Sequence, residues 1–152
     1  MNTDSIPPIH QLIPHSGDMC LLACVTHWDA DQIVCSATSH CSLDNPLRSD
    51  NTLPVHTGIE YAGQAIAAHG SLLAHSLSSP AAHAPRHGMI AILNGVHWHR
   101  ARLDDITTPL TVHATRLTAL PQGMEYRFCV HTPQHGSLIE GTLIVALQGT
   151  EA

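Results

Sequence analysis

The stretch HTGIEYAGQAIAAHGSLLAHSL, residues 56–77, decides the fold, because it predicts the only long helix of the chain. Its apolar side chains recur at close to a helical period. The alanines and glycine between positions 62 and 68 keep this helix thin nearly all round, which suits close packing against other backbone. The following SSPAAHAPRHG contains two prolines and a glycine, which are expected to end the helix.

Short strand-like runs flank this helix. Before it, MCLLACVTHWDADQIVCSATS, residues 19–39, divides at DAD and predicts a hairpin with its turn near Asp29–Asp31. After it come four more runs with turn signals between them, at residues 89–103, 109–120, 124–133 and 137–147. Two strands, one helix and four strands without intervening helices predict an antiparallel α+β domain whose sheet wraps the helix. We expect residues 1–152 to form one such domain.

Composition excludes several classes of function. The chain has twelve acidic residues, six arginines and no lysine, for a net charge of -6, so we expect no binding to nucleic acid. No run approaches the ~18 apolar residues of a membrane span. The five cysteines form no CxxC pair, which favours reduced thiols. The sequence therefore predicts a soluble, cytoplasmic protein.

His56 and Glu60 are candidate catalytic residues. Four positions apart on a helix, their Cβ atoms would lie ~5–6 Å apart, close enough to share a proton, a metal or a substrate. In the alternative interpretation, Glu60 only interacts with the positive end of the helix and His56 is an exposed first-turn residue. Glu60 stands in the most apolar helix, where burying a carboxylate is costly unless it has a task. Desolvation there would favour its protonated form and let it act as an acid.

The start of the same helix offers candidate substrate-binding groups. Backbone N–H groups around Thr57 and Gly58 are expected to be free and able to receive a developing oxyanion. Gln64, one helical turn after Glu60, is a third candidate for substrate binding.

Three of the six arginines lie near one another in sequence. Arg100 and Arg102 would share a face of the predicted strand, and Arg86 precedes that strand, so the three predict one positive patch. In one interpretation, this patch binds a phosphate or an acidic protein. In the other, the arginines are only a solvated strand end.

Histidines near these arginines raise the question of a metal. His97 and His99 would share a strand face, with His83 and His87 close by, which makes a zinc site conceivable. The chain contains no HExxH motif and no Cys/His pairing at zinc-finger spacing. We therefore expect no metal and no cofactor.

Three stretches together resemble a known family: LIPHSGDMCLLACV (12–25), LPVHTGIEYAGQAIAAHG (53–70) and GMIAILNGVHWHRARL (88–103). They resemble the hotdog-fold 3-hydroxyacyl-[acyl carrier protein] dehydratases, and most closely the divergent branch of aryl-polyene gene clusters. The resemblance implies a long central helix wrapped by a six-stranded antiparallel sheet. It also implies dimers with active sites at the interface, and acyl carrier protein as a partner that the arginine patch would dock.

The resemblance also implies a mechanism. In the typical family, a loop histidine of one subunit removes the proton α to the thioester carbonyl, and a helix carboxylic acid of the other protonates the departing 3-hydroxyl. Glu60 matches the position of that carboxylate. Fourteen residues before it, where the histidine is expected, this chain has Pro46.

Three explanations of the missing histidine stay open. Another histidine such as His56 or His40 replaces it; a second hotdog dehydratase supplies it in a heterodimer rather than a homodimer; or the chain is a non-catalytic partner subunit. The expected reaction is dehydration of 3-hydroxyacyl-[acyl carrier protein] thioesters to trans-2-enoyl thioesters. An acyl-thioester hydrolase is the alternative activity, because the same fold can use a helix carboxylate to activate water.

Overall fold

The predicted order of two strands, one helix and four strands is confirmed by the computed structural model of the protein, which describes residues 5–76, 88–120 and 123–147. The main elements are β1 Cys24–Trp28, β2 Gln32–Ala37, α1 Gly58–Ser76, β3 Gly88–Trp98, β4 Leu110–Leu120, β5 Gly123–Thr132 and β6 Gly136–Leu147. Short 3-10 turns occur at Ile9–Gln11, Gly17–Met19, Ser39–Cys41 and Val55–Thr57.

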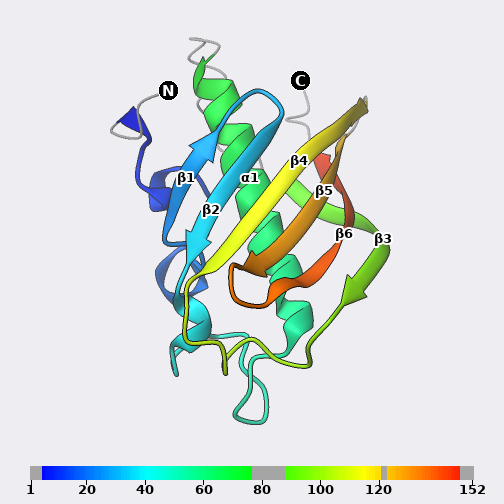
Figure 1. Cartoon of the computed structure of the whole chain (residues 1–152). Coiled ribbons are helices and arrows are strands. Elements are labelled where there is room, and N and C mark those ends of the chain that lie inside the picture. Colours follow the sequence, from blue (N-terminus) through cyan, green and yellow to red (C-terminus); the bar gives the residue numbers. More distant parts are fainter. Residues whose placement is uncertain (1–4, 77–87, 121–122, 148–152) are drawn as a thin grey trace.

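The six strands form one antiparallel sheet in the order β1-β2-β4-β5-β6-β3. Figure 1 shows this sheet curving around α1, which runs along one face of it, so the predicted fold class is confirmed. The predicted hairpin joins β1 to β2, and Asp29 closes its turn by accepting the backbone N–H of Asp31 at 2.8 Å and that of Gln32 at 3.1 Å. The two edges of the sheet are β1 and β3.

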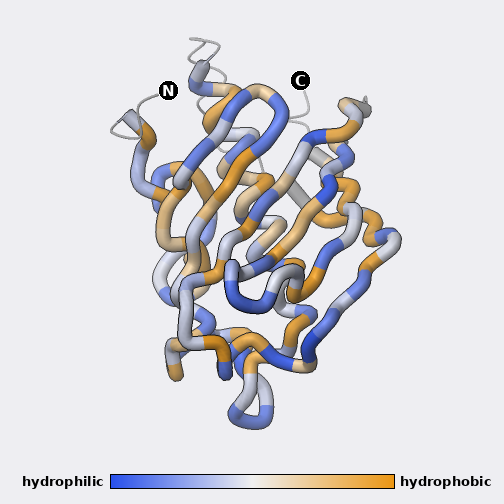
Figure 2. The backbone as a smooth tube through the Cα atoms, viewed as in Figure 1, coloured by the Kyte–Doolittle hydropathy of each residue, from blue (hydrophilic) through white to orange (hydrophobic). Residues whose placement is uncertain are grey.

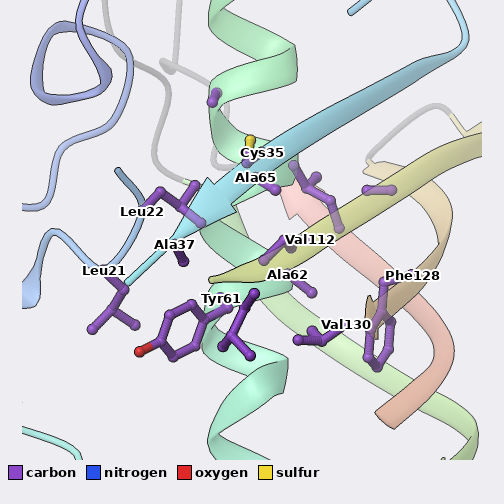
Figure 3. Close-up of a cluster of buried hydrophobic side chains, with 14 of the residues drawn as sticks. Leu21, Leu22, Cys35, Ala37, Tyr61, Ala62, Ala65, Val112, Phe128 and Val130 are labelled. Carbon is purple, nitrogen blue, oxygen red and sulfur yellow. The ribbon is translucent and has the colours of Figure 1, made fainter. Parts of the chain in front are cut away.

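The core lies between α1 and the sheet face that it covers. Tyr61, Ala62 and Ala65 of the helix are fully buried; Figure 3 shows Ala62 and Ala65 close to the strands, while the Tyr61 ring extends toward Leu21. Alanine on this face lets the helix backbone approach the sheet closely. Every second residue of β2 is buried, and the turn that joins β5 to β6 is hydrophilic (Figure 2).

A buried histidine ties the middle of the helix to two other elements. His69 of α1 is fully buried; its Nε2–H donates to the carbonyl of Asp29 at 2.7 Å, so its Nδ1 accepts from the Tyr126 hydroxyl, also at 2.7 Å. Burial lowers the pKa of His69, so the neutral ring is favoured at neutral pH.

The third strand is shorter than the sequence predicts. The run 89–103 was expected to form a single strand, but β3 ends at Trp98 and the chain then leaves the sheet. The segment after it pairs instead with the approach to α1: Val55 N donates to Ala101 O at 3.0 Å, and Leu103 N to Leu53 O at 2.8 Å. Because β3 ends early, the expectation that Arg100 and Arg102 share a strand face is wrong.

Candidate active site

The start of α1 is held in place by the turn before it. Pro54 precedes the 3-10 turn Val55–Thr57 with φ near the helical value, -60°, which proline favours. The Thr57 hydroxyl donates to the Pro54 carbonyl at 2.7 Å, and the Thr57 N–H donates to the same oxygen at 3.1 Å. The Gly58 N–H bonds to Val55 O. The amides of Thr57 and Gly58, expected to be free, are therefore already engaged.

Glu60 lies in the first turn of α1 with its side chain exposed. Its neighbours Tyr61 and Ala62 face the core, which places Glu60 on the side of the helix that the sheet does not cover. The expectation that this carboxylate is buried within its own chain is therefore wrong. Among the described residues it has no hydrogen-bond or ion-pair partner, so any desolvation has to come from another molecule.

His56 is exposed and lies on the 3-10 turn rather than on α1 itself. The α-helical spacing of 5–6 Å used to pair it with Glu60 therefore does not apply directly, because the helix begins at Gly58. Within the described part of the chain, no hydrogen bond joins the two side chains. Both side chains are nevertheless exposed near the start of the helix.

The loop between β2 and α1 is fixed to the helix by a polar network. Ser39 Oγ donates to Leu21 O at 2.7 Å and so accepts from the Tyr61 hydroxyl, also at 2.7 Å. Asn45 Nδ2 donates to the Tyr61 oxygen at 3.1 Å. Pro46, where the family's histidine would stand, is the exposed next residue of this loop. The sequence did not reveal this network, because its members are separated by 16 to 22 residues.

His40, considered as a substitute base, is buried and holds two backbone segments together. Its side chain is only 1% exposed, and Nε2 lies 3.0 Å from the carbonyl oxygens of both Ile106 and Thr108. Since carbonyls only accept, Nε2 carries the proton. Burial lowers the pKa of His40. The ring therefore ties the β2–α1 loop to the segment before β4.

Gln64 is also occupied within the chain. This buried side chain accepts the Leu21 N–H at 2.9 Å and donates to Met19 O at 2.7 Å, which holds the segment before β1 against α1. Both ends of the amide are used in these contacts, so the structure places Gln64 as a tie between segments.

The predicted arginine patch contains carboxylates. Arg100 Nη2 donates to Asp105 Oδ2 at 3.2 Å, while Arg102 forms a two-point pair with Asp104, with Nε to Oδ1 at 2.9 Å. Hydrogen bonds from Arg102 and from the Leu53 N–H hold the pKa of Asp104 well below its usual range. The structure thus compensates the charge of both arginines locally. Arg86 lies outside the described residues.

Of the histidines considered for a metal, the described ones, His97 and His99, belong to no metal-binding group of the described residues. Across residues 5–76, 88–120 and 123–147, no three His, Cys, Asp or Glu side chains lie close enough to hold a metal ion. His97 and His99 are exposed, and His99 Nε2 lies 3.5 Å from Glu140 Oε1. His83 and His87 lie outside the described residues.

No helix of the described chain is long and apolar enough to cross a membrane.

A six-stranded antiparallel sheet wrapped around one long helix is the hotdog fold, and solved structures share it. One is the dehydratase heterocomplex ApeI:P from Xenorhabdus doucetiae, with 19% identity, TM-score 0.81, and coverage of 95% of this chain and 93% of that chain. Another is a hypothetical thioesterase with coenzyme A from Streptococcus pneumoniae TIGR4, with 12% identity, TM-score 0.54, and coverage of 85% and 88%. A third is the PaaI protein of Escherichia coli, with 11% identity, TM-score 0.55, and coverage of 80% of each chain.

The chain belongs to the ApeP-like family, because the model of that family, described as ApeP dehydratase, matches residues 7–150. This match confirms the resemblance that the sequence motifs indicated. No curated protein matches the chain.

Proposed function

We propose that the chain is one subunit of a hotdog dehydratase that converts 3-hydroxyacyl-[acyl carrier protein] thioesters to trans-2-enoyl thioesters, with Glu60 as the general acid. The observation that carries this proposal is an exposed carboxylate without a partner in the described part of the chain, at the start of the central helix, in a chain of the ApeP dehydratase family. The reaction takes place in the cytoplasm, in a fatty-acid-like or aryl-polyene pathway.

The proposed reaction needs one base and one acid. The base removes a proton from the carbon α to the thioester carbonyl, and that electron pair forms the double bond as the bond between carbon 3 and its hydroxyl breaks. Glu60 gives its proton to the leaving oxygen, which departs as water. An acid at this step has to be protonated when the substrate is bound, and exclusion of water around a carboxyl favours that form.

A second hotdog subunit is the best source of both the base and the water exclusion. In this chain Pro46 replaces the expected histidine. His40 is buried, and its Nε2–H is hydrogen-bonded to two backbone carbonyl oxygens. The ApeI:P structure is a dehydratase heterocomplex with the same fold, which supports a heterodimer here. Within the chain, His56 is the alternative base.

The free edge of the sheet supports such pairing. β3 is an edge strand, and three of its large apolar residues are unusually exposed: Ile92 at 53%, Leu93 at 45% and Trp98 at 62%. An apolar strand edge left open to water is a site for association with another chain.

Docking of the acidic carrier protein at Arg86, Arg100 and Arg102 is part of the same proposal. A carrier would have to compete with Asp104 and Asp105 for Arg102 and Arg100. Neutralising each arginine should therefore slow carrier-bound substrate more than the same acyl group on a short thioester.

The direct test compares this chain alone, the second subunit alone and the co-purified pair, with a 3-hydroxyacyl-[acyl carrier protein] as substrate. Enoyl product is followed by mass, and free thiol is followed in the same samples. We expect enoyl product from the pair and no free thiol. Thiol release by this chain alone would instead identify a hydrolase, the activity suggested by the thioesterases of the same fold.

A His56→Asn variant separates the two sources of the base. If the second subunit supplies it, the pair carrying this variant keeps most of its turnover. A loss of about 10²- to 10⁴-fold, the usual contribution of a general base, would make His56 the base.

A further inference from the structure

A buried carboxylate lies beside the segment that leads into α1. Asp104, in the segment between β3 and β4, has a side chain only 7% exposed. Its Oδ1 accepts the Leu53 N–H at 2.9 Å and Arg102 Nε at 2.9 Å, while Oδ2 accepts Arg102 Nη2. Arg48 Nη1 approaches the same Oδ2 to 3.8 Å. A fully paired buried carboxylate of this kind fixes the groups around it.

The segment that Asp104 holds is short and is paired on one side. Leu103 N donates to Leu53 O at 2.8 Å and Val55 N to Ala101 O at 3.0 Å, so residues 53–55 form a small antiparallel pairing with residues 101–103. Leu53 itself is fully buried, which means that water cannot replace the acceptor of its N–H. The turn Val55–Thr57 and then α1 follow directly.

The geometry points to Asp104 as the positioning residue for Glu60. The Glu60 side chain has no partner among the described residues, so its location depends on where the backbone places the first turn of α1. That turn starts from residues 53–55, which Asp104 fixes through the Leu53 N–H. The role rests on the proposed function of Glu60, but the positioning itself is a property of the fold that can be measured without turnover.

Asp105 provides a matched control. It is the next residue, carries the same charge and pairs with Arg100 at 3.2 Å, but its side chain is 43% exposed, and none of its hydrogen bonds reaches residues 53–55. Removing either carboxylate changes the charge of the chain equally. Only removal of Asp104 takes the acceptor from Leu53.

The experiment measures amide hydrogen exchange of residues 53–60 in the full chain, and kcat and KM of the co-purified pair, for Asp104→Ala, Asp104→Asn and Asp105→Ala. We expect exchange at Leu53 to be about tenfold faster in Asp104→Ala, as for a lost buried hydrogen bond. With the acyl group on a short thioester, which does not use the arginine patch, we expect kcat to fall about 10- to 100-fold with KM little changed, because a misplaced catalytic group affects the reaction step. Asp104→Asn keeps an oxygen for the Leu53 N–H, so it should recover most of the exchange protection at Leu53 and most of kcat.

Equal effects of Asp105→Ala, or unchanged exchange in Asp104→Ala, would overturn the positioning role. If Asp104→Ala does not fold, Asp104→Asn provides the test of the positioning role. Loss of kcat without faster exchange in Asp104→Asn would assign the effect to charge rather than to position. A wild-type pair without dehydratase activity would contradict the proposed function, while the exchange data would still report on the positioning.

Discussion

Gly58 and Ile139 approach so closely that a β-carbon on Gly58 would lie 2.7 Å from Cγ2 of Ile139. Gly58 is the first residue of α1, and Ile139 is a fully buried residue of β6. Their contact sets the distance between the start of the helix and the sheet. The first turn, which carries Glu60, therefore depends on glycine at this position.

Replacing Gly58 with alanine should force the helix start away from β6. We expect a loss of about 1–3 kcal/mol in the free energy of unfolding, as for other overpacked sites. Gly70→Ala is the control, because a β-carbon there meets nothing within 4 Å. That change should stabilise the chain by up to about 1 kcal/mol, since alanine favours the helix. Urea denaturation of both variants measures the difference; a change of the same sign in both would contradict this account.

The exposed apolar edge predicts how the subunits associate. Placing a charge at Leu93 or Trp98 of β3 should weaken the complex with the second subunit by about tenfold or more in Kd, because apolar anchors dominate interfaces. Leu117→Glu is the matched control: this leucine is also exposed, at 39%, but lies on β4 inside the sheet. Native mass measurement of the co-expressed chains reports assembly. Equal weakening by all three changes would argue against β3 as the interface.

Two buried histidines of the described chain predict how stability depends on pH. Burial lowers the pKa of both His40 and His69 in the folded chain, whereas in the unfolded chain both titrate near pH 6.5. The unfolded chain therefore binds more protons below about pH 6.5. The stability from the neutral rings is fully present above that pH and is lost as the pH falls toward the folded-state pKa values.

The measurement is the free energy of unfolding at several pH values between 7.5 and about 5, where carboxylates still contribute little. His69→Gln should show a shallower fall than the wild type, because one of the protonations that favour the unfolded chain has been removed. An identical slope in wild type and variant would show that His69 does not contribute.

The fold was predictable because its signals are local. The helical period of residues 56–77 and the DAD turn each lie within one short window, and the structure places α1 and the first hairpin there. The end of β3 was missed because the run from 89 to 103 stays rich in strand-forming residues. What ends the strand is pairing with residues 53–55, nearly 50 positions away.

The candidate site was only partly predictable for the same reason. Glu60 stands out as a candidate because a carboxylate in an alanine-rich helix is conspicuous, but the composition of the helix did not reveal that one face stays outside the sheet. The tie between Asp104 and Leu53 spans 51 positions, and the bond between Tyr126 and His69 spans 57. Neither pair leaves a pattern in the sequence.

The central claim is that Glu60 gives the proton to the leaving hydroxyl, and the most direct test is the turnover of the co-purified pair carrying Glu60→Gln. We predict a loss of about 10²- to 10⁴-fold in the rate of enoyl formation, with the stability of the isolated chain unchanged because the side chain is exposed there. Glu125→Gln on β5, in register with Thr118 and Ile144, should keep full turnover. Turnover retained within a few-fold in Glu60→Gln would contradict the claim and leave this chain as a non-catalytic partner.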